Sequence, residues 1–278
     1  MKPSKEGLNP LSRTILLLCL SLLPAAGMAA GDPDAPASNA TLNRILVQAH
    51  KSVGDFWQQF QSVTCVEKVA QEKLGKKGDI EYLRKSTYDY LVLSDENQDG
   101  FSLEESRLLQ GKESKAQKVP LLITSGISTL LLVFHPFYAE DFSYRLDGEE
   151  MVGTQKLLRI RFEHIPGKRS TTALRLRGKD LSLEIQGVAS MDPETGAIHR
   201  IVAGLSAPMS DINLKVLEMD VRYDPQAFGT AGDIYWLPST AAINIQTERQ
   251  HWRNVHQYSN YKRFSVNTEN KMANNPSR

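Results

Sequence analysis

The sequence has few cysteines, few aromatic residues and almost no net charge. Of its 278 residues, 2 are cysteine and 8% are aromatic, and 33 basic residues stand against 32 acidic ones. Two cysteines are too few for a disulfide-rich scaffold. A net charge of +1 supplies no long-range attraction to a phosphate backbone, so we expect no nucleic-acid partner. After the first thirty residues, no stretch approaches the roughly 20 apolar residues of a membrane-spanning helix.

The first thirty residues have the layout of a secretory signal peptide. Lys2, Lys5 and Arg13 precede the apolar run 15–23, and a stretch of small residues follows it. A cut after Ala29 leaves small side chains at the positions that direct cleavage. We therefore predict a signal peptide over residues 1–29 and a periplasmic or secreted location for the mature chain.

The mature chain is predicted to be a short leader followed by one large domain. Residues 30–39 are rich in Pro, Asp and Ala and are expected to be disordered, as is the polar tail 267–278. No Pro-, Gly- or Ser-rich linker divides residues 40–266, which predicts a single β-rich domain there. Cys65 has no partner for an internal disulfide, so we expect it to be a buried apolar residue.

The domain is expected to begin with an amphipathic helix. Ser38 or Asn39 can cap its start, and apolar residues then recur at helical spacing. This apolar stripe consists of Leu42, Ile45, Leu46, Ala49, Val53, Phe56, Trp57 and Phe60. A second, shorter helix is predicted within 120–138, where apolar residues are nearly unbroken and Pro136 is expected to end the helix.

From Val63 onward the apolar period changes from about 3.6 to about 2, which predicts strands. Apolar residues alternate with polar ones in the runs 88–93, 158–163, 181–186, 217–223 and 243–246. Such alternation is typical of an antiparallel sheet with one face on a core. Turn signals separate the runs, among them Asp192 to Gly196. The predicted fold class is therefore α+β, with an antiparallel sheet covered by the two helices.

Motifs that carry chemistry are absent from the sequence. There is no G-x-S-x-G nucleophile elbow, no phosphate-binding loop, and no His or Cys spacing of a zinc site. Asp95 to Gly100 open like a calcium loop, but Ser106 stands where the closing Glu is required, so a polar hairpin tip explains them equally well. We therefore expect no catalytic residue, no metal and no cofactor.

Two stretches resemble a known family. Residues 188–201 (VASMDPETGAIHRI) are similar to the strand, D-P-x-T-G turn and return strand of the LolA/LolB-like periplasmic lipoprotein-carrier superfamily. Residues 232–239 (GDIYWLPS) and 258–264 (YSNYKRF) are similar to its final hairpin. The resemblance implies a strongly curved antiparallel sheet, a half-barrel closed by the helices, whose concave apolar face holds acyl chains.

The leading hypothesis is an envelope protein that binds a lipid, an acyl chain or another hydrophobic ligand without catalysis, with lipoprotein handling as one such role. The residues expected on the ligand-binding face are Leu217, Met219, Val221, Tyr223, Trp236, Ile243 and Ile245, with Phe134 in the lid. All of them suit a packed core equally well. The first alternative is therefore a filled-core structural or interaction module that binds an envelope protein partner through an edge strand. The second is a hydrolase whose scattered carboxylates, such as Glu149 and Asp192, are brought together by folding.

Overall fold

The computed structural model describes residues 35–60, 63–97, 100–111, 123–176, 179–228 and 233–263. After Ala35, all of these residues belong to the second of two units, Met1–Ala35 and Pro36–Arg278. The predicted signal peptide 1–29 and the tail 267–278 lie outside the described residues. Within the described ranges, no helix combines the length and the apolar character that crossing a membrane requires.

The one α-helix of the described residues is α1 (Ala35–Phe60). It buries five residues of the predicted apolar stripe: Ile45, Ala49, Val53, Phe56 and Trp57. Leu42 and Leu46 are partly buried against the same core, and the side chain of Phe60 lies outside the described residues. The helix begins before Ser38 and Asn39, the caps predicted for it, so residues 35–39 belong to the helix and not to a disordered leader. Ala is the best helix former, and Pro36 fits the first turn because an N–H at that position would have no partner within the helix.

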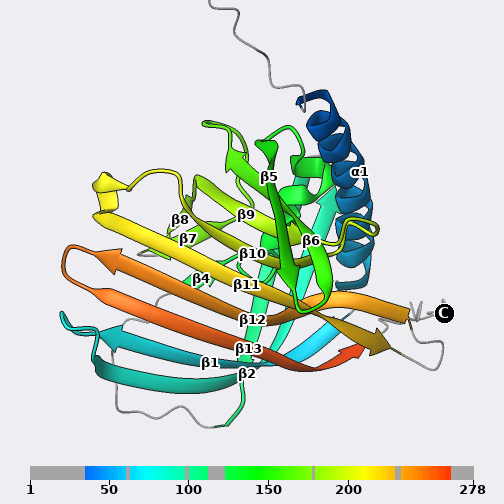
Figure 1. Cartoon of the computed structure of the whole chain (residues 1–278). Helices are drawn as coiled ribbons and strands as arrows, with labels where there is room; N and C mark the ends of the chain where they lie inside the picture. The colour runs from blue at the N-terminus through cyan, green and yellow to red at the C-terminus, as the bar shows by residue number, and fades with distance from the viewer. Residues whose placement is uncertain are drawn as a thin grey trace, which may run out of the picture. The chain divides into compact units, whose positions relative to one another are not determined.

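Ten strands form one antiparallel sheet in the order β3-β2-β1-β13-β12-β11-β10-β9-β6-β5. The strands are β1 (Val63–Leu74), β2 (Ile80–Asn97), β3 (Gly100–Leu109), β5 (Phe142–Val152), β6 (Gln155–His164), β9 (Ile185–Met191), β10 (Ile198–Leu205), β11 (Leu214–Phe228), β12 (Asp233–Thr247) and β13 (His251–Arg263). β1 pairs with β13, so strands from the two ends of the domain lie side by side within the sheet (Figure 1). The sheet does not close into a barrel, and β3 and β5 are its edges.

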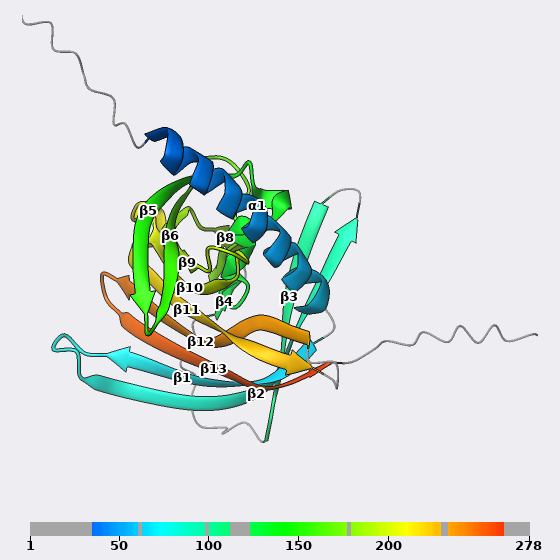
Figure 2. The ribbon, with the colours of Figure 1, turned by 45° about the vertical axis from the view of Figure 1, so that its right-hand side comes forward.

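The sheet curls toward α1. In Figure 2 the β5–β6 hairpin and the β2–β3 hairpin rise on either side, and α1 lies across the space between them. We call the face toward α1 the inner face. Along β13, the buried residues Trp252, Asn254, His256 and Tyr258 lie on the inner face and alternate with outer ones such as the exposed Arg253. The curved antiparallel sheet is confirmed, with more strand and less helix than the predicted α+β class.

A short apolar segment packs onto the inner face. It contains two 3-10 helices, η1 (Leu130–Phe134) and η2 (Pro136–Tyr138), and we call these residues together the plug. Every residue of η1 is buried. The predicted short buried helix is present as the 3-10 helix η1, which ends before Pro136 as expected, and Pro136 then begins η2. Proline has no N–H to donate to the Leu132 carbonyl, so an α-helix cannot continue through it. Residues 120–122 of the prediction lie outside the described residues.

Three short strands form a second sheet in the order β4-β7-β8, namely β4 (Ile123–Ser125), β7 (Ala173–Leu176) and β8 (Lys179–Ser182). The run 181–186 is not the single strand predicted, because β8 ends at Ser182 and β9 begins at Ile185. Between them, the Leu183 N–H donates to the Thr172 carbonyl at 3.1 Å. The Leu183 N–H therefore pairs with a loop residue and not with a neighbouring strand, and this break in the pairing separates β8 from β9.

The turn between β9 and β10 is the predicted hairpin, and it lies directly against α1. The Asp192 carboxylate accepts hydrogen bonds from the Thr195 N–H at 2.7 Å and the Thr195 hydroxyl at 2.9 Å. Gly196 adopts a left-handed conformation with φ of 70°. A Cβ on Gly196 would lie 2.5 Å from the Ala49 nitrogen of α1. Only glycine therefore allows this close approach of hairpin and helix.

The polar stretch from Asp95 to Gly100 joins β2 to β3 as a hairpin, with Asn97 paired to Gly100. The pairing agrees with the interpretation of this stretch as a polar hairpin. Residues 98–99 lie outside the described residues. Cys65 is buried on β1, as predicted. Burial is the main reason why the pKa of its thiol is raised to about 12, so the thiol stays protonated.

Candidate functional site

Most residues predicted for the ligand-binding face come together on the inner face and are covered. They are Leu217, Met219, Val221 and Tyr223 of β11, Ile243 and Ile245 of β12, and Phe134 of η1. Each of these side chains is at most 2% exposed, and all belong to one core cluster. Trp236 of β12 is half-buried and packs against that cluster. The inner face is therefore filled by side chains of this chain.

Two tyrosine hydroxyls of the ten-stranded sheet form hydrogen bonds that hold the plug on its inner face. The Leu131 N–H donates to the Tyr223 hydroxyl at 3.1 Å, and the Tyr144 hydroxyl donates to the Val133 carbonyl at 2.5 Å. Burial raises the pKa of both tyrosines, so both hydroxyls stay protonated at neutral pH. These bonds satisfy backbone groups of η1 that have no partner in a regular ladder.

An open pocket lies between α1, the β9–β10 turn and the start of β12. We call it the α1 pocket; its volume is about 350 Å³. Its lining is mostly apolar: Val53, Phe56, Leu131, Ala197, Ile198, Ile234, Tyr235 and Trp236, with Lys51, Ser52, Asp55 and Thr195 completing it. Ile234 is 63% exposed. Of the residues predicted for the ligand-binding face, only Trp236 lines this pocket.

The indole of Trp236 is stacked on the imidazole of His199. The ring centroids are 3.9 Å apart and the ring planes meet at 29°. Burial lowers the pKa of His199, and the nearby carboxylates of Asp192 and Asp224 oppose this shift without cancelling it. His199 Nε2 is buried and has no hydrogen-bond partner in the described part of the chain. The neutral imidazole is therefore the form that this position favours.

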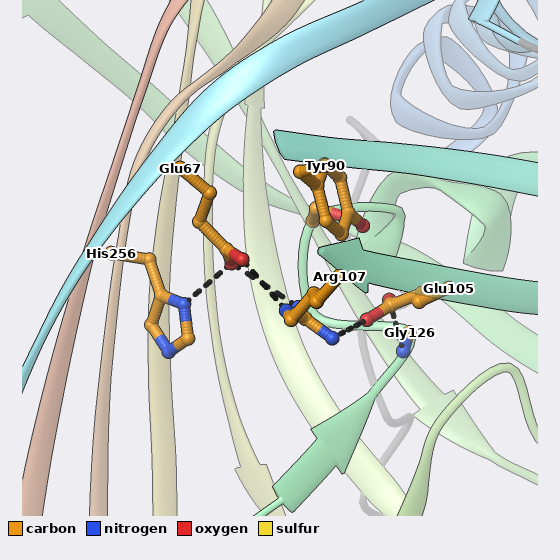
Figure 3. A network of polar contacts seen from close by, with 7 residues as sticks. Glu67, Tyr90, Glu105, Arg107, Gly126 and His256 are labelled. Carbon is orange, nitrogen blue, oxygen red and sulfur yellow. Dashed lines mark hydrogen bonds and ion pairs between the residues drawn. The ribbon is translucent and has the colours of Figure 1, made fainter. Parts of the chain in front are cut away.

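A buried polar network joins side chains of β1, β3 and β13, with β2 lying between β1 and β3 in the sheet (Figure 3). Glu67, which is fully buried, accepts hydrogen bonds from Arg107 Nε at 2.7 Å and Nη2 at 3.2 Å. His256 Nδ1 lies 2.8 Å from the same carboxylate. Arg107 also donates to Glu105 at 2.8 Å, and Glu105 accepts from the Gly126 N–H at 2.8 Å. The network thus connects three strands to the backbone that leads into the plug.

The electrostatics of this network favour charged, paired groups. Burial opposes ionisation of Glu67, but the hydrogen bonds from His256 and Arg107 outweigh it, and the pKa of Glu67 lies below its ordinary value. The pKa of Arg107 is raised even though burial disfavours its charge, mainly because Glu105 is close. A general acid at neutral pH needs a raised carboxyl pKa, so Glu67 is not set up for that role. The described residues also include no group of three or more His, Cys, Asp or Glu suited to hold a metal ion.

No motif in the amino-acid sequence marks this network as a site. One feature of the sequence indicates that Glu67 is buried: it follows Cys65 by two residues and therefore shares the inward face of its strand. Its partners are far away in the chain, at 40 residues for Arg107 and 189 for His256. Spacing within a single strand could not find them.

A larger groove of about 990 Å³ borders outward-facing residues of β6, β9, β10 and β11. The three arginines in its lining are already paired. Arg159 and Arg161 both contact Asp147, at 3.0 and 3.1 Å, and Arg200 pairs with Asp220 at 2.7 Å. Leu217 and Met219 also border this groove, although their side chains are buried. Apolar ligands would have to desolvate these ion pairs, so the smaller α1 pocket suits them better.

No family model matches the sequence, and no curated protein matches it either. Among solved structures, a LolA superfamily protein from Nitrosomonas europaea is 12% identical, covering 81% of this chain and 94% of its own, with a TM-score of 0.38. A DUF1329 family protein from Desulfovibrio piger is 11% identical, covering 78% and 92%, with a TM-score of 0.39. An outer membrane lipoprotein-sorting domain from Vibrio parahaemolyticus is 11% identical, covering 80% and 96%, with a TM-score of 0.36.

One of these structures is named as a LolA superfamily protein and another as a lipoprotein-sorting domain, which agrees with the family that residues 188–264 resemble. With TM-scores below 0.5, these likenesses decide nothing about the function of this chain.

Proposed function

We propose that this chain binds a slender hydrophobic ligand, such as a single acyl chain, in the α1 pocket. The observation that carries the proposal is an open pocket whose lining is mostly apolar and which includes a large aliphatic side chain, Ile234, left 63% exposed. Exposed apolar surface beside a concavity is characteristic of binding sites. A ligand in the pocket would cover Ile234 and remove this surface from water.

The size of the pocket limits the ligand. Its volume of about 350 Å³ is near the lower end of the roughly 300–1,000 Å³ that small-molecule sites occupy. It therefore accommodates one chain or one ring system. Leu131, at the pocket, belongs to the plug, so deeper access to Val221 or Ile243 requires the plug to move.

The proposed role is binding without chemistry, in the cell envelope. The hydrolase alternative names Asp192, and although burial opposes it, hydrogen bonds from Thr195 hold the pKa of Asp192 below its ordinary value. This argues against Asp192 as a general acid, which needs a carboxyl group that keeps its proton at neutral pH. The envelope location rests on the predicted signal peptide over residues 1–29. In this setting the chain would hold or carry a lipid or acyl chain, and an envelope protein partner would deliver or receive it.

The test is binding of N-phenyl-1-naphthylamine, a neutral probe that fluoresces in apolar surroundings. We expect saturable binding by the wild type and about 5-fold weaker binding by Ile234→Ser, because covering the exposed part of an isoleucine contributes about 1 kcal/mol. Met151→Ser is the matched control, since Met151 is also 63% exposed but lies on the β5–β6 hairpin. Absence of saturable binding, or equal losses in both variants, would contradict the proposal.

A filled-core interaction module is the second candidate, and the packing of the inner face favours it. The plug and α1 cover this face with their own side chains, among them Phe134 and Val53. If the wild type does not bind the probe, this candidate takes precedence, and the edge strands β3 and β5 become the places to look for a partner.

A further inference from the structure

Trp236 is the lining residue of the α1 pocket with the largest flat surface, and its position depends on a neighbour outside the lining. The indole comes from β12 and the imidazole of His199 from β10, with β11 between them in the sheet. The two rings stack at a centroid distance of 3.9 Å. His199 is not among the residues that line the pocket.

We propose that His199 is a positioning residue, whose neutral imidazole holds the Trp236 indole at the angle that forms the pocket wall. This inference rests on the proposed function, because it concerns how the same pocket is kept in shape. A half-buried tryptophan can occupy several rotamers, and stacking on a ring that is fixed in a strand selects one of them. The imidazole thus acts on the ligand through Trp236, without touching it.

The surroundings of His199 make this support sensitive to protons. The groups that face it are Asp192 from the β9–β10 turn, Asp224 from β11 and the indole from β12. Both carboxylates favour a charged imidazole, but burial outweighs them and lowers the pKa of His199. A charged ring carries an N–H on both nitrogens, and Nε2 is buried without a hydrogen-bond partner among the described residues, so the charged form has an unsatisfied N–H there. Acid therefore acts against the stacked arrangement.

A ligand that packs on Trp236 removes further water from this region and disfavours the charged imidazole more strongly. Binding and protonation of His199 then oppose each other through linkage. The affinity for a neutral ligand is expected to be highest above the pKa of His199 and to decrease as the pH falls through it. Because that pKa lies below its ordinary value, the loss is expected only in acid.

The experiment measures N-phenyl-1-naphthylamine affinity between pH 8 and pH 5 in the wild type, His199→Ala and His199→Phe. At pH 8 we expect His199→Ala to bind about 2- to 10-fold more weakly, the range that an aromatic pair supports. His199→Phe keeps a stacking ring without a titratable group, so it should restore the affinity and abolish the acid loss. His251→Ala, on β13, is the control for removal of a histidine elsewhere.

Circular dichroism of each variant establishes that it is folded. Wild-type affinity in His199→Ala, or an acid loss that persists in His199→Phe, would overturn the positioning role while leaving hydrophobic binding in place. If the wild type binds no probe at any pH, the proposed function fails and this inference fails with it. The two failures are therefore distinguishable.

Discussion

Replacing Gly196 by alanine should separate the β9–β10 turn from α1. Gly196 has φ of 70°, and an added Cβ would lie 2.5 Å from both the Ala49 nitrogen and the Gln48 carbonyl carbon. These are backbone atoms of a helix and cannot rotate away. Either the turn or α1 must therefore move, and with it the wall that both contribute to the α1 pocket.

The size of the effect follows from two contributions. A left-handed conformation disfavours alanine relative to glycine by about 1–2 kcal/mol. Relief of the backbone contact disturbs the packing of Ala49 and its neighbours, which we put at roughly 2 kcal/mol more. The matched control is Gly153→Ala, because Gly153 has φ of 61° and no atom within 4 Å of an added Cβ. Gly153→Ala therefore introduces the backbone strain of a left-handed conformation without a steric contact.

Urea unfolding followed by circular dichroism measures both variants. We expect Gly196→Ala to lose about 3–4 kcal/mol of unfolding free energy and Gly153→Ala about 1–2 kcal/mol. Since 1 kcal/mol corresponds to roughly 2–4 °C in a domain of this size, the melting temperatures should differ by several degrees. Probe binding should weaken in Gly196→Ala only. Equal destabilisation by the two substitutions would refute the claim that the close approach to α1 matters.

Three further predictions concern the buried hydrogen bonds. Glu67→Gln should destabilise the fold by about 3–5 kcal/mol in urea unfolding, because it removes a fully buried charge that pairs with both Arg107 and His256 and leaves Arg107 with Glu105 alone. A loss below 1 kcal/mol would show that the network is dispensable. The pKa of Glu67 is lowered in the folded state, so its contribution is complete above the unfolded pKa of about 4.3 and is lost as the pH falls below that value. Acid unfolding of the wild type should accordingly be steeper than that of Glu67→Gln, and identical acid profiles would contradict this. Tyr223→Phe removes the acceptor of the Leu131 N–H and should cost about 1–3 kcal/mol, with faster amide exchange at Leu131 as the specific sign; unchanged exchange there would count against the bond.

The side-chain alternation of strands was readable from the sequence alone. Leu217, Val221 and Ile243 lie on the inner face because successive side chains in a strand point to opposite sides, whatever the tertiary context. The apolar stripe of α1 follows from helical period in the same way. Boundaries were less predictable: the helix begins at Ala35 and not after its expected caps, because early helical turns tolerate Pro36.

The candidate site depends on contacts that periodicity does not specify. Glu67 and His256 are 189 residues apart, and only the pairing of β1 with β13 brings them together. Whether the inner face is open or filled depends on how η1 packs, and Phe134 suits a lid, a core or a ligand site equally well. The α1 pocket likewise needs the turn at Gly196 to meet the helix, which no local pattern in either segment reveals.

The most direct test of the central claim is photoaffinity labelling of the folded protein with a dodecyl diazirine, followed by mass spectrometry of the peptides. Binding in the α1 pocket predicts saturable labelling on residues 51–56 of α1 and on residues 234–236, with a reduced yield in Ile234→Ser. Labelling that does not saturate, or that concentrates on the strands around Arg159 and Arg200, would contradict the account.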